Sequence, residues 1–323
     1  MAHFNVTLIF TAFGPPSPLN YGVFFLTLVT YLTTVFANFI LMLVIYCDTS
    51  LHKPMYIFVF NLAINGLTGC SAVLPVIMNY LVDNVKNISY TGCLLQVFFV
   101  NFYGSSGYGL LTVMAYDRYV AICKPLQYHT VMTPVKVKLL LAVVYTSTIC
   151  FLGVQVYFTS NLPLCGHTVN KLFCDNLAVV SLSCVKSAFV DIYGLFGVVI
   201  FVVLPPVFVI MSYIRILLIC LRASANAKQK ALKTCAPHLI TFMNFLSASL
   251  FSVIYNRYNN FLPKEVNVFI SVHFIMLPPL LNPLIYGIRT EQINKSFRKL
   301  LQKRVFGLEF PVKTDDHVKK ISI

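Results

Sequence analysis

The sequence predicts an all-α protein: an integral membrane bundle of seven transmembrane helices plus a short amphipathic helix at the inner leaflet. Of its 323 residues, 58% are hydrophobic and only 11% are charged, and the mean hydropathy is +0.79. Soluble domains of this length are about one quarter charged, so the composition excludes that class. The apolar residues also gather into seven blocks, each long enough to cross a hydrocarbon layer about 30 Å thick.

The predicted spans are, in chain order, 21–46, 55–82, 94–116, 137–159, 190–214, 236–257 and 266–288. Asp, Glu, Lys and Arg are nearly absent inside them, while His238 and His273 lie well within two of them. Helices are expected because lipid offers no partner to backbone N–H and C=O groups. The spans therefore predict one helical membrane domain over residues 21–289, with residues 1–20 before it.

The basic residues set the orientation of this domain. Of the 24 Lys and Arg, nineteen lie on the side opposite the N-terminus, and the other five are Lys86, Lys171, Lys186, Arg257 and Lys264. The positive-inside rule then places residues 1–20 outside the cell and the C-terminus in the cytoplasm. The net charge of +14 is thus mostly an inner surface that faces anionic lipid, and we expect no nucleic-acid partner.

Residues 290–304 predict a helix that lies along the inner leaflet of the bilayer. Ile293, Phe297, Leu300 and Leu301 fall on one apolar stripe, and basic residues occupy the rest of the surface. Residues 305–323 fit a solvated cytoplasmic tail better.

Ten cysteines divide by this topology. Six lie in spans or at the reducing inner face, where free thiols are expected. The other four, Cys93, Cys165, Cys174 and Cys184, lie outside, where an oxidising compartment favours disulfides. Four cysteines allow three pairings, and cysteine arithmetic does not choose among them.

Two glycosylation sequons fall outside the membrane, at Asn5-Val6-Thr7 and Asn87-Ile88-Ser89, so Asn5 and Asn87 are predicted glycan sites. Asn294-Lys295-Ser296 has the same pattern, but on the cytoplasmic side we expect it to stay unmodified.

An acid and a base, Asp117 and Arg118, directly follow the third apolar block, in MAYDRYVAICKP. Arg118 is 25 residues after Cys93, about 37 Å along an α-helix, which places the pair at the inner edge of the membrane. One interpretation is a pair of interfacial charges that snorkel toward water. Polar groups at a similar depth, Tyr213 and the segment 282–286, favour another: a hydrogen-bonded latch with two arrangements.

The segment MAYDRYVAICKPLQY resembles the hallmark of odorant receptors, a family of rhodopsin-like G-protein-coupled receptors. LHKPMYIFVFNLA at 51–63, KALKTCAPHL at 230–239 and PLLNPLIYGIRT at 279–290 occupy the matching places, and the spacing of the three cysteines in the long outer loop fits as well. The resemblance covers nearly the whole chain, and as a set these motifs are highly specific.

The resemblance implies a set of roles. Asp117 would hold Arg118 in the resting state, and Arg118 would be released toward a G protein when the sixth span swings outward. Tyr213 and Tyr286 would stabilise the active arrangement. The implied switch residues are Asp117, Arg118, Tyr119, Tyr213, Asn282, Pro283 and Tyr286. The implied disulfides are Cys93 with Cys174 and Cys165 with Cys184.

Three departures from the family pattern affect these expectations. Rhodopsin-like receptors usually carry an Asp in the second span, where this chain has Gly66 beside Asn65, and Gly107 occupies a place where odorant receptors often have an acid. We therefore expect no sodium site, and the Asn-Gly variant resembles fish-type odorant receptors. The chain also has no Trp, so Phe245 and Leu246 stand where the sixth span usually carries an aromatic toggle.

One face of the third span is the predicted ligand site. Five residues repeat at helical spacing inward from Cys93, and two more lie at comparable depth on the sixth span and near the outer end of the fifth. The set is Val97, Asn101, Gly104, Ser105, Tyr108, Ser249 and Tyr193. The alternative is structural, because Gly and Ser also permit close helix packing and Asn can hydrogen-bond to a neighbouring helix.

Other classes of function fit less well. No catalytic Ser-His-Asp set, phosphate-binding loop or metal-ligand spacing is present, so we predict no enzyme, no cofactor and no metal site; His238 is expected to pack or to join the latch. The seventh span has no Lys for a retinal Schiff base. A small transporter or channel is the main rival, although its ionisable mid-membrane residues are missing.

The resemblance implies an odorant as ligand, a heterotrimeric G protein of the olfactory type as partner, and the plasma membrane of sensory neuron cilia as location.

Overall fold

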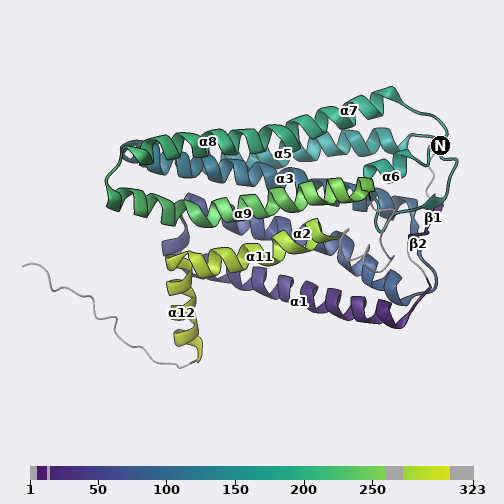
Figure 1. Cartoon of the computed structure of the whole chain (residues 1–323), viewed down its shortest axis with the longest axis horizontal. Helices are drawn as coiled ribbons and strands as arrows, with labels where there is room; N and C mark the ends of the chain where they lie inside the picture. Colours follow the sequence, from purple (N-terminus) through teal and green to yellow (C-terminus); the bar gives the residue numbers. More distant parts are fainter. Residues whose placement is uncertain (1–5, 13–14, 259–271, 306–323) are drawn as a thin grey trace, which may run out of the picture.

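The computed structural model describes residues 6–12, 15–258 and 272–305. Within these residues, long helices run side by side along the longest axis of the molecule (Figure 1). They are α1 (Pro18–Cys47), α2 (Pro54–Val82), α3 (Tyr90–Cys123), α5 (Pro134–Ser160), the continuous run of α7 (Ala188–Val198), η3 (Val199–Val203) and α8 (Leu204–Leu221), α9 (Ala225–Tyr258) and α11 (His273–Arg289). These seven match the seven predicted spans, except that residues 266–271 of the last span lie outside the described residues.

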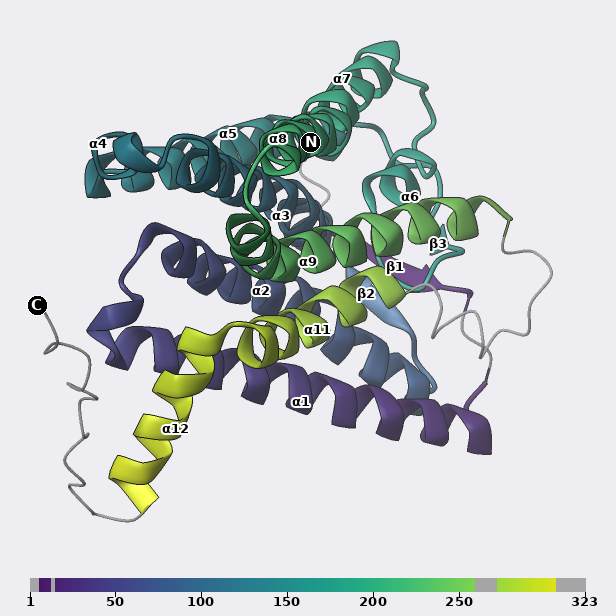
Figure 2. The same cartoon turned by 60° about the vertical axis from the view of Figure 1, so that its left-hand side comes forward.

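The short elements lie at the two ends of the bundle. At the inner end, α12 (Glu291–Val305) is steeply angled to the bundle (Figure 1), and α4 (Tyr128–Val131) lies beyond the end of α5 (Figure 2). The turns after α1 and α3 contain η1 (Thr49–Leu51) and η2 (Pro125–Gln127). At the outer end are β1 (Thr7–Phe10), β2 (Asn87–Ser89), β3 (Thr168–Val169) and α6 (Asn176–Val180).

Hydroxyl side chains and prolines begin several of the helices. The hydroxyls of Ser17, Ser89 and Thr133 accept the backbone N–H three residues later at the starts of α1, α3 and α5. Pro18 and Pro134 occupy the first position of α1 and α5, where no hydrogen bond from the backbone nitrogen is needed.

Helix α3 is the central helix of the bundle. It contacts α2, α5, α8 and α9, and Figure 2 shows it between α2 on one side and α5 and α8 on the other. A residue on α3 can therefore touch most of the bundle, which explains why both predicted functional sites involve this helix.

Prolines inside the helices are accommodated in two ways. The π-helix η3 ends two residues before Pro205, and its wider turn relieves the clash of the rings of Pro205 and Pro206 with the carbonyls four residues earlier. In α11, the carbonyl of Pro279 accepts a hydrogen bond from the Asn38 side-chain amide of α1 at 2.8 Å. The Asn38 side chain of a neighbouring helix thus provides a hydrogen-bond donor for a backbone carbonyl of this proline-rich helix. Lipid could not provide one.

The outer surface of the bundle is apolar. Side chains such as Phe25, Phe36, Ile192 and Leu217 are mostly exposed, which suits lipid and not water. Within the described residues, four segments are long and apolar enough to cross a membrane by length and hydropathy alone: α1, α2, α5 and Ala188–Leu221. Helices α3, α9 and α11 carry the polar side chains described below, and α11 is described over 17 residues.

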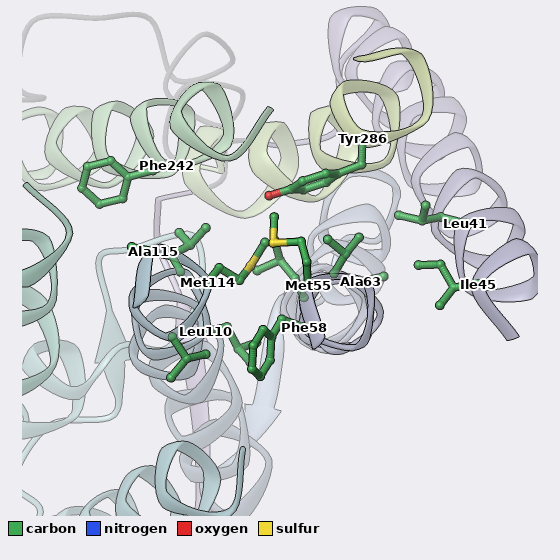
Figure 3. Packing of buried hydrophobic residues seen from close by; sticks show 14 of the residues in the cluster. Leu41, Ile45, Met55, Phe58, Ala63, Leu110, Met114, Ala115, Phe242 and Tyr286 are labelled. Carbon is green, nitrogen blue, oxygen red and sulfur yellow. The ribbon is translucent and has the colours of Figure 1, made fainter. Parts of the chain in front are cut away.

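The buried core is divided into an inner and an outer cluster. Figure 3 shows the inner cluster, where Met55 and Phe58 of α2 pack with Met114 of α3, Phe242 of α9 and Tyr286 of α11. The outer cluster surrounds the disulfide of Cys93 and includes side chains of α2, α3, α11, β1 and the loop between α5 and α7.

Two disulfides tie the outer loops, and their pairing is the one implied by the resemblance. Cys93 at the start of α3 is bonded to Cys174, with the two Cα atoms 5.4 Å apart. Cys165 is bonded to Cys184 within the loop between α5 and α7, with a Cα separation of 5.1 Å.

Helix α12 packs partly on the bundle and partly away from it. Ile293 and Ser296 are buried, and the Tyr56 hydroxyl of α2 donates to the Gln292 side chain. Hydrogen bonds from Ser296 and Ser50 hold the pKa of Asp48, just after α1, below its ordinary value. Phe297 and Leu301 remain exposed, as the apolar side of a helix on the inner leaflet requires.

Candidate functional site

The Asp117–Arg118 pair is closed and turned inward at the inner end of α3. The Asp117 side chain is fully buried and that of Arg118 is 12% exposed. Arg118 Nε donates to Oδ2 of Asp117 at 2.9 Å, and the Tyr128 hydroxyl donates to Oδ1 at 2.8 Å. Both carboxylate oxygens therefore have donors, which a buried charge needs in order to offset its loss of water.

Tyr128 is a further candidate for the switch, and it is not among the switch residues predicted from the sequence. It is the last residue of MAYDRYVAICKPLQY and begins α4, the short helix that follows α3. Burial raises the pKa of Tyr128 above its ordinary value, and the nearby Asp117 carboxylate raises it further. The hydroxyl therefore keeps its proton at neutral pH and remains a donor to Asp117.

A second polar chain joins α8, α9 and α3 near the same end. The Tyr213 hydroxyl lies 2.6 Å from Nδ1 of His238, and Nε2 of His238 lies 3.0 Å from the Leu111 carbonyl. A carbonyl can only accept, so Nε2 carries the ring proton of a neutral imidazole, and Nδ1 accepts from Tyr213. His238 is fully buried, and it holds α9 against α3 through this bond.

Tyr286 of α11 has an unsatisfied hydroxyl in the same region. Its ring is buried and points into the inner cluster, toward the side of Met55 (Figure 3). The hydroxyl lies near Thr241 of α9, and among the described residues neither oxygen has a partner within hydrogen-bond distance. Asn282, one turn earlier, also has an unpaired side-chain oxygen. Such groups cost about 1–3 kcal/mol each, so a new partner would be favoured.

The structure brings most of the predicted switch residues together. Tyr286 belongs to the inner cluster, and Tyr119 and Tyr213 pack against it. Pro283 is buried in α11 between Asn282 and Tyr286. Tyr119 packs beside Tyr213 in a small cluster that also holds the free cysteines Cys123, Cys220 and Cys235.

The predicted ligand face of α3 contains one contact to α9 and one partly buried amide. The Tyr108 hydroxyl is hydrogen-bonded to the Ser249 hydroxyl, and Ser249 donates to the Leu246 carbonyl at 2.9 Å. Asn101 donates to the Val97 carbonyl of its own helix at 2.9 Å. Because this bond uses one amide hydrogen, the side chain retains a second donor and its carbonyl acceptor.

The surroundings of the glycines on α3 distinguish positions that serve close helix packing from positions that could face a ligand. A Cβ atom added at Gly109 would lie 2.8 Å from Val144, and at Gly107 it would lie 2.7 Å from the Phe245 ring, so both positions serve close packing. At Gly104 the nearest atoms, in the Phe274 ring, are 3.9 Å away, which is ordinary van der Waals contact. Close packing does not require a glycine there. This leaves Gly104 and its half-buried neighbour Ser105 as candidates for a ligand-facing wall.

Tyr193, the predicted ligand residue near the outer end of the fifth span, packs on α5. Its ring stacks on Phe151 of α5, with centroids 4.3 Å apart, and its hydroxyl donates to the Phe151 carbonyl at 3.1 Å. These contacts hold α7 against α5, and the role of Tyr193 in the ligand site stays a prediction.

An aromatic cluster lies between the two sites, in the place where the family usually has its toggle. The Phe245 ring packs edge-on against Tyr108 at 4.8 Å, and it also contacts Tyr103 and Phe274. It occupies the space beside Gly107, while Pro279 packs against Gly66. At the two glycine positions where the resemblance implied an acid, the adjacent space is filled by Pro279 beside Gly66 and by the Phe245 ring and the Asn65 amide beside Gly107.

The comparisons with known proteins agree along the whole bundle. A family model described as olfactory receptor matches residues 26–304. Olfactory receptor 4E1 of Homo sapiens is 37% identical over 88% of this chain and 89% of its own length. Olfactory receptor 1E16 of Mus musculus is 34% identical over 95% of this chain and 99% of its own, and Olfactory receptor 10A6 of Homo sapiens is 32% identical over 93% and 96%.

These matches extend from α1 into α12, so they cover the latch, the ligand face and the outer loops alike. They favour a receptor over the transporter or channel that the apolar spans alone left open. The chain belongs to the olfactory receptor family, and it is a multi-pass membrane protein that acts as an odorant-activated G-protein-coupled receptor.

Proposed function

We propose that the receptor binds a small odorant in the outer half of the bundle and transmits binding to its cytoplasmic end through α9. The proposed site is one face of α3 with a facing hydroxyl on α9. Its residues are Val97, Asn101, Gly104, Ser105, Tyr108 and Ser249. Such a site offers apolar surface with a few polar groups, which suits small, volatile ligands.

The observation that carries the proposal is the double attachment of α9 to α3. Ser249 is hydrogen-bonded to Tyr108 in the outer half, and His238 is bonded to the Leu111 carbonyl near the inner end. Phe245 packs on α3 between the two. A ligand that competes for Tyr108 or Ser249 would loosen the outer attachment, and the rigid helix would pass the change to His238.

At the inner end, the switch works by exchanging partners. Movement of α9 frees Tyr213 from His238, and Arg118 can then leave Asp117 for the hydroxyls of Tyr213 and Tyr286. The unsatisfied hydroxyl of Tyr286 supports this step, because a new hydrogen bond there removes a penalty already present in the resting arrangement.

The G-protein partner would dock on the cytoplasmic face beside this switch. Leu126 of η2 is 98% exposed and lies two residues before Tyr128, so it offers an apolar contact next to the residue that restrains Asp117. We propose a G protein of the olfactory type, which would raise cAMP.

The proposal includes the location and the modifications of the receptor. The N-terminus would face the outside of sensory neuron cilia, with glycans on Asn5 and Asn87. Asn87 is exposed on β2, and Asn5 lies outside the described residues. The excess of Lys and Arg on the opposite side supports this orientation.

The test is the cAMP response of transfected cells to a broad panel of odorants, with and without the olfactory-type G-protein α subunit. Cells with the receptor and that subunit should respond, and the Arg118→Ala variant at a matched surface level should not. A variant that signalled as strongly as the wild type would contradict the role of Arg118. The absence of any response at verified surface expression would contradict the coupling.

A further inference from the structure

The N-terminal strand β1 is the central strand of the sheet at the outer end, in the order β2-β1-β3. Phe10 donates its backbone N–H to the Lys86 carbonyl at 2.9 Å, on the side of β2. Ile9 and Thr11 donate to the carbonyls of His167 and Val169 at 2.8 and 3.0 Å, on the side of β3. Strand β1 therefore joins the first and second outer loops.

The side chains of β1 alternate between the core and the outer surface. Leu8 is 0% exposed and Phe10 is 3% exposed, whereas Ile9 between them is 51% exposed. The Phe10 ring lies 5.1 Å from the ring of Tyr80. Two apolar side chains of the N-terminus are thus fully inside the outer cluster, and one points away from it.

This outer cluster is continuous with the proposed ligand face. It contains Val97, the outermost residue of that face, together with Leu8 and Phe10. Val97 is linked to the face below it, because its carbonyl accepts the amide of Asn101 one turn deeper. The apolar residues of β1 therefore lie on the outer side of the polar groups on α3.

We propose that Leu8 and Phe10 form the outer wall of the odorant site, so that the N-terminal strand helps to select the ligand. This rests on the proposed function. Because the wall is aliphatic and aromatic while Asn101 and Ser105 supply the polar contacts deeper down, the preferred ligands are small molecules with one polar end and an apolar body. The apolar body faces β1 and the polar end faces α3.

The backbone bonds of β1 make this wall a fixed part of the site. Its hydrogen bonds run to two different loops, and the loop with β3 is tied to α3 by the Cys93–Cys174 disulfide. Small changes in Leu8 or Phe10 therefore alter the shape of the wall while the strand stays paired.

The test compares Leu8→Val and Phe10→Leu with Ile9→Val, a matched change on the outward face of the same strand. Potencies of a panel of small aliphatic and aromatic alcohols, aldehydes and esters are measured by cAMP at equal surface levels. Losing one buried CH₂ contact corresponds to roughly a fourfold change in affinity. Leu8→Val should change the relative potencies within the panel by about this factor, and Phe10→Leu, which removes more carbon atoms, should change them by more. Ile9→Val should leave them unchanged.

An unchanged order in both inward variants, with normal surface levels, would overturn the proposal even though the receptor signals. If the wild type gives no cAMP response to the panel, the proposed function fails. The role of Leu8 and Phe10 in ligand binding is then tested by hydrogen exchange on purified receptor. Slower exchange of the amides of Ile9, Phe10 and Thr11 in the presence of the panel supports it, and unchanged exchange overturns it. A drop in surface level alone, with the potency order kept, indicates a purely structural strand and also overturns it.

Discussion

Asp117 is held by two donors that come from different elements, and this determines how firmly it restrains Arg118. Its Oδ2 accepts from Arg118 on the same helix, while its Oδ1 accepts from Tyr128 on α4. The tyrosine fixes the orientation of the carboxylate, so that the other oxygen faces Arg118. The restraint therefore depends on the inner loop as well as on α3.

The Tyr128→Phe variant tests this dependence. Removing the hydroxyl leaves Oδ1 of a buried carboxylate without its donor, and hydrogen bonds to charged groups are worth about 1.5–3 kcal/mol. We expect basal cAMP without odorant to rise severalfold, but less than in Asp117→Asn, which removes the charge itself. Tyr46→Phe is the control, because Tyr46 is 74% exposed. Equal basal cAMP in Tyr128→Phe and wild type, with Asp117→Asn raised, would exclude Tyr128 from the latch.

The Asn101→Leu and Ser105→Ala variants test the ligand face of α3. Asn101 keeps a free donor and acceptor after its bond to Val97, so Leu in its place removes a polar contact to ligand while keeping the branched shape and the number of side-chain heavy atoms. We expect the order of agonist potencies to change while the surface level does not. Should every agonist keep its potency in both variants, the site lies elsewhere.

At the scale of residues, the sequence predicts a side chain's position best where a motif fixes its place on a helix. Arg118, Tyr213 and Tyr286 lie within electrostatic reach of one another because each stands near the inner end of a span. The partnership of Tyr128 with Asp117 could not be read from spacing, because it depends on the path of the loop after α3. The partner of Tyr193 depends on the rotation of α7 about its axis, which a segment with apolar residues around most of its circumference does not define.

At the scale of elements, the outer loops depend on bonds between distant segments. The Cys93–Cys174 bond joins residues 81 positions apart, and the Cys165–Cys184 bond joins residues 19 apart. In the chain-entropy description, closing the longer loop stabilises the fold by about 1 kcal/mol more than closing the shorter one.

Single cysteine variants should therefore differ in severity. Cys174→Ser removes the bond between the loop and α3, so we expect most of the receptor to remain inside the cell. Cys184→Ser should reduce the surface level less. Surface labelling of tagged receptor against total protein measures both. An equal or reversed order would mean that loop closure does not decide folding here, and Cys150→Ser, a change at an exposed free cysteine, is the control.

The long helices were predictable from sequence, and the strands were not. Each helix is defined by its own apolar block, as for α2, where the predicted span 55–82 corresponds to Pro54–Val82. Strand β1 is four residues long, and its partners β2 and β3 lie about 80 and 160 residues away. Such short strands carry no pattern of their own, and their pairing is set by where the outer loops converge.

At the scale of the whole molecule, the two ends of the bundle differ in charge and in chemistry. By the predicted topology, nineteen of the 24 Lys and Arg lie on the side of Arg118 and α12, where anionic lipid and a G protein would be met. The opposite end holds both disulfides and the three-stranded sheet. Disulfides form in oxidising compartments, so bonding and charge both support the proposed orientation.

Glycan mapping tests this orientation for the whole chain, because the three sequons lie on both sides of the predicted membrane. Asn87 is exposed on β2, opposite Ile9 in the sheet, and Asn294 lies on α12 at the other end. Glycosidase treatment should remove two glycans from the wild type and one from Asn5→Gln or Asn87→Gln. It should remove two from Asn294→Gln, because a cytoplasmic sequon never meets the transferase. Loss of a glycan in Asn294→Gln would invert the topology, and with it the placement of ligand and G protein at opposite ends of the bundle.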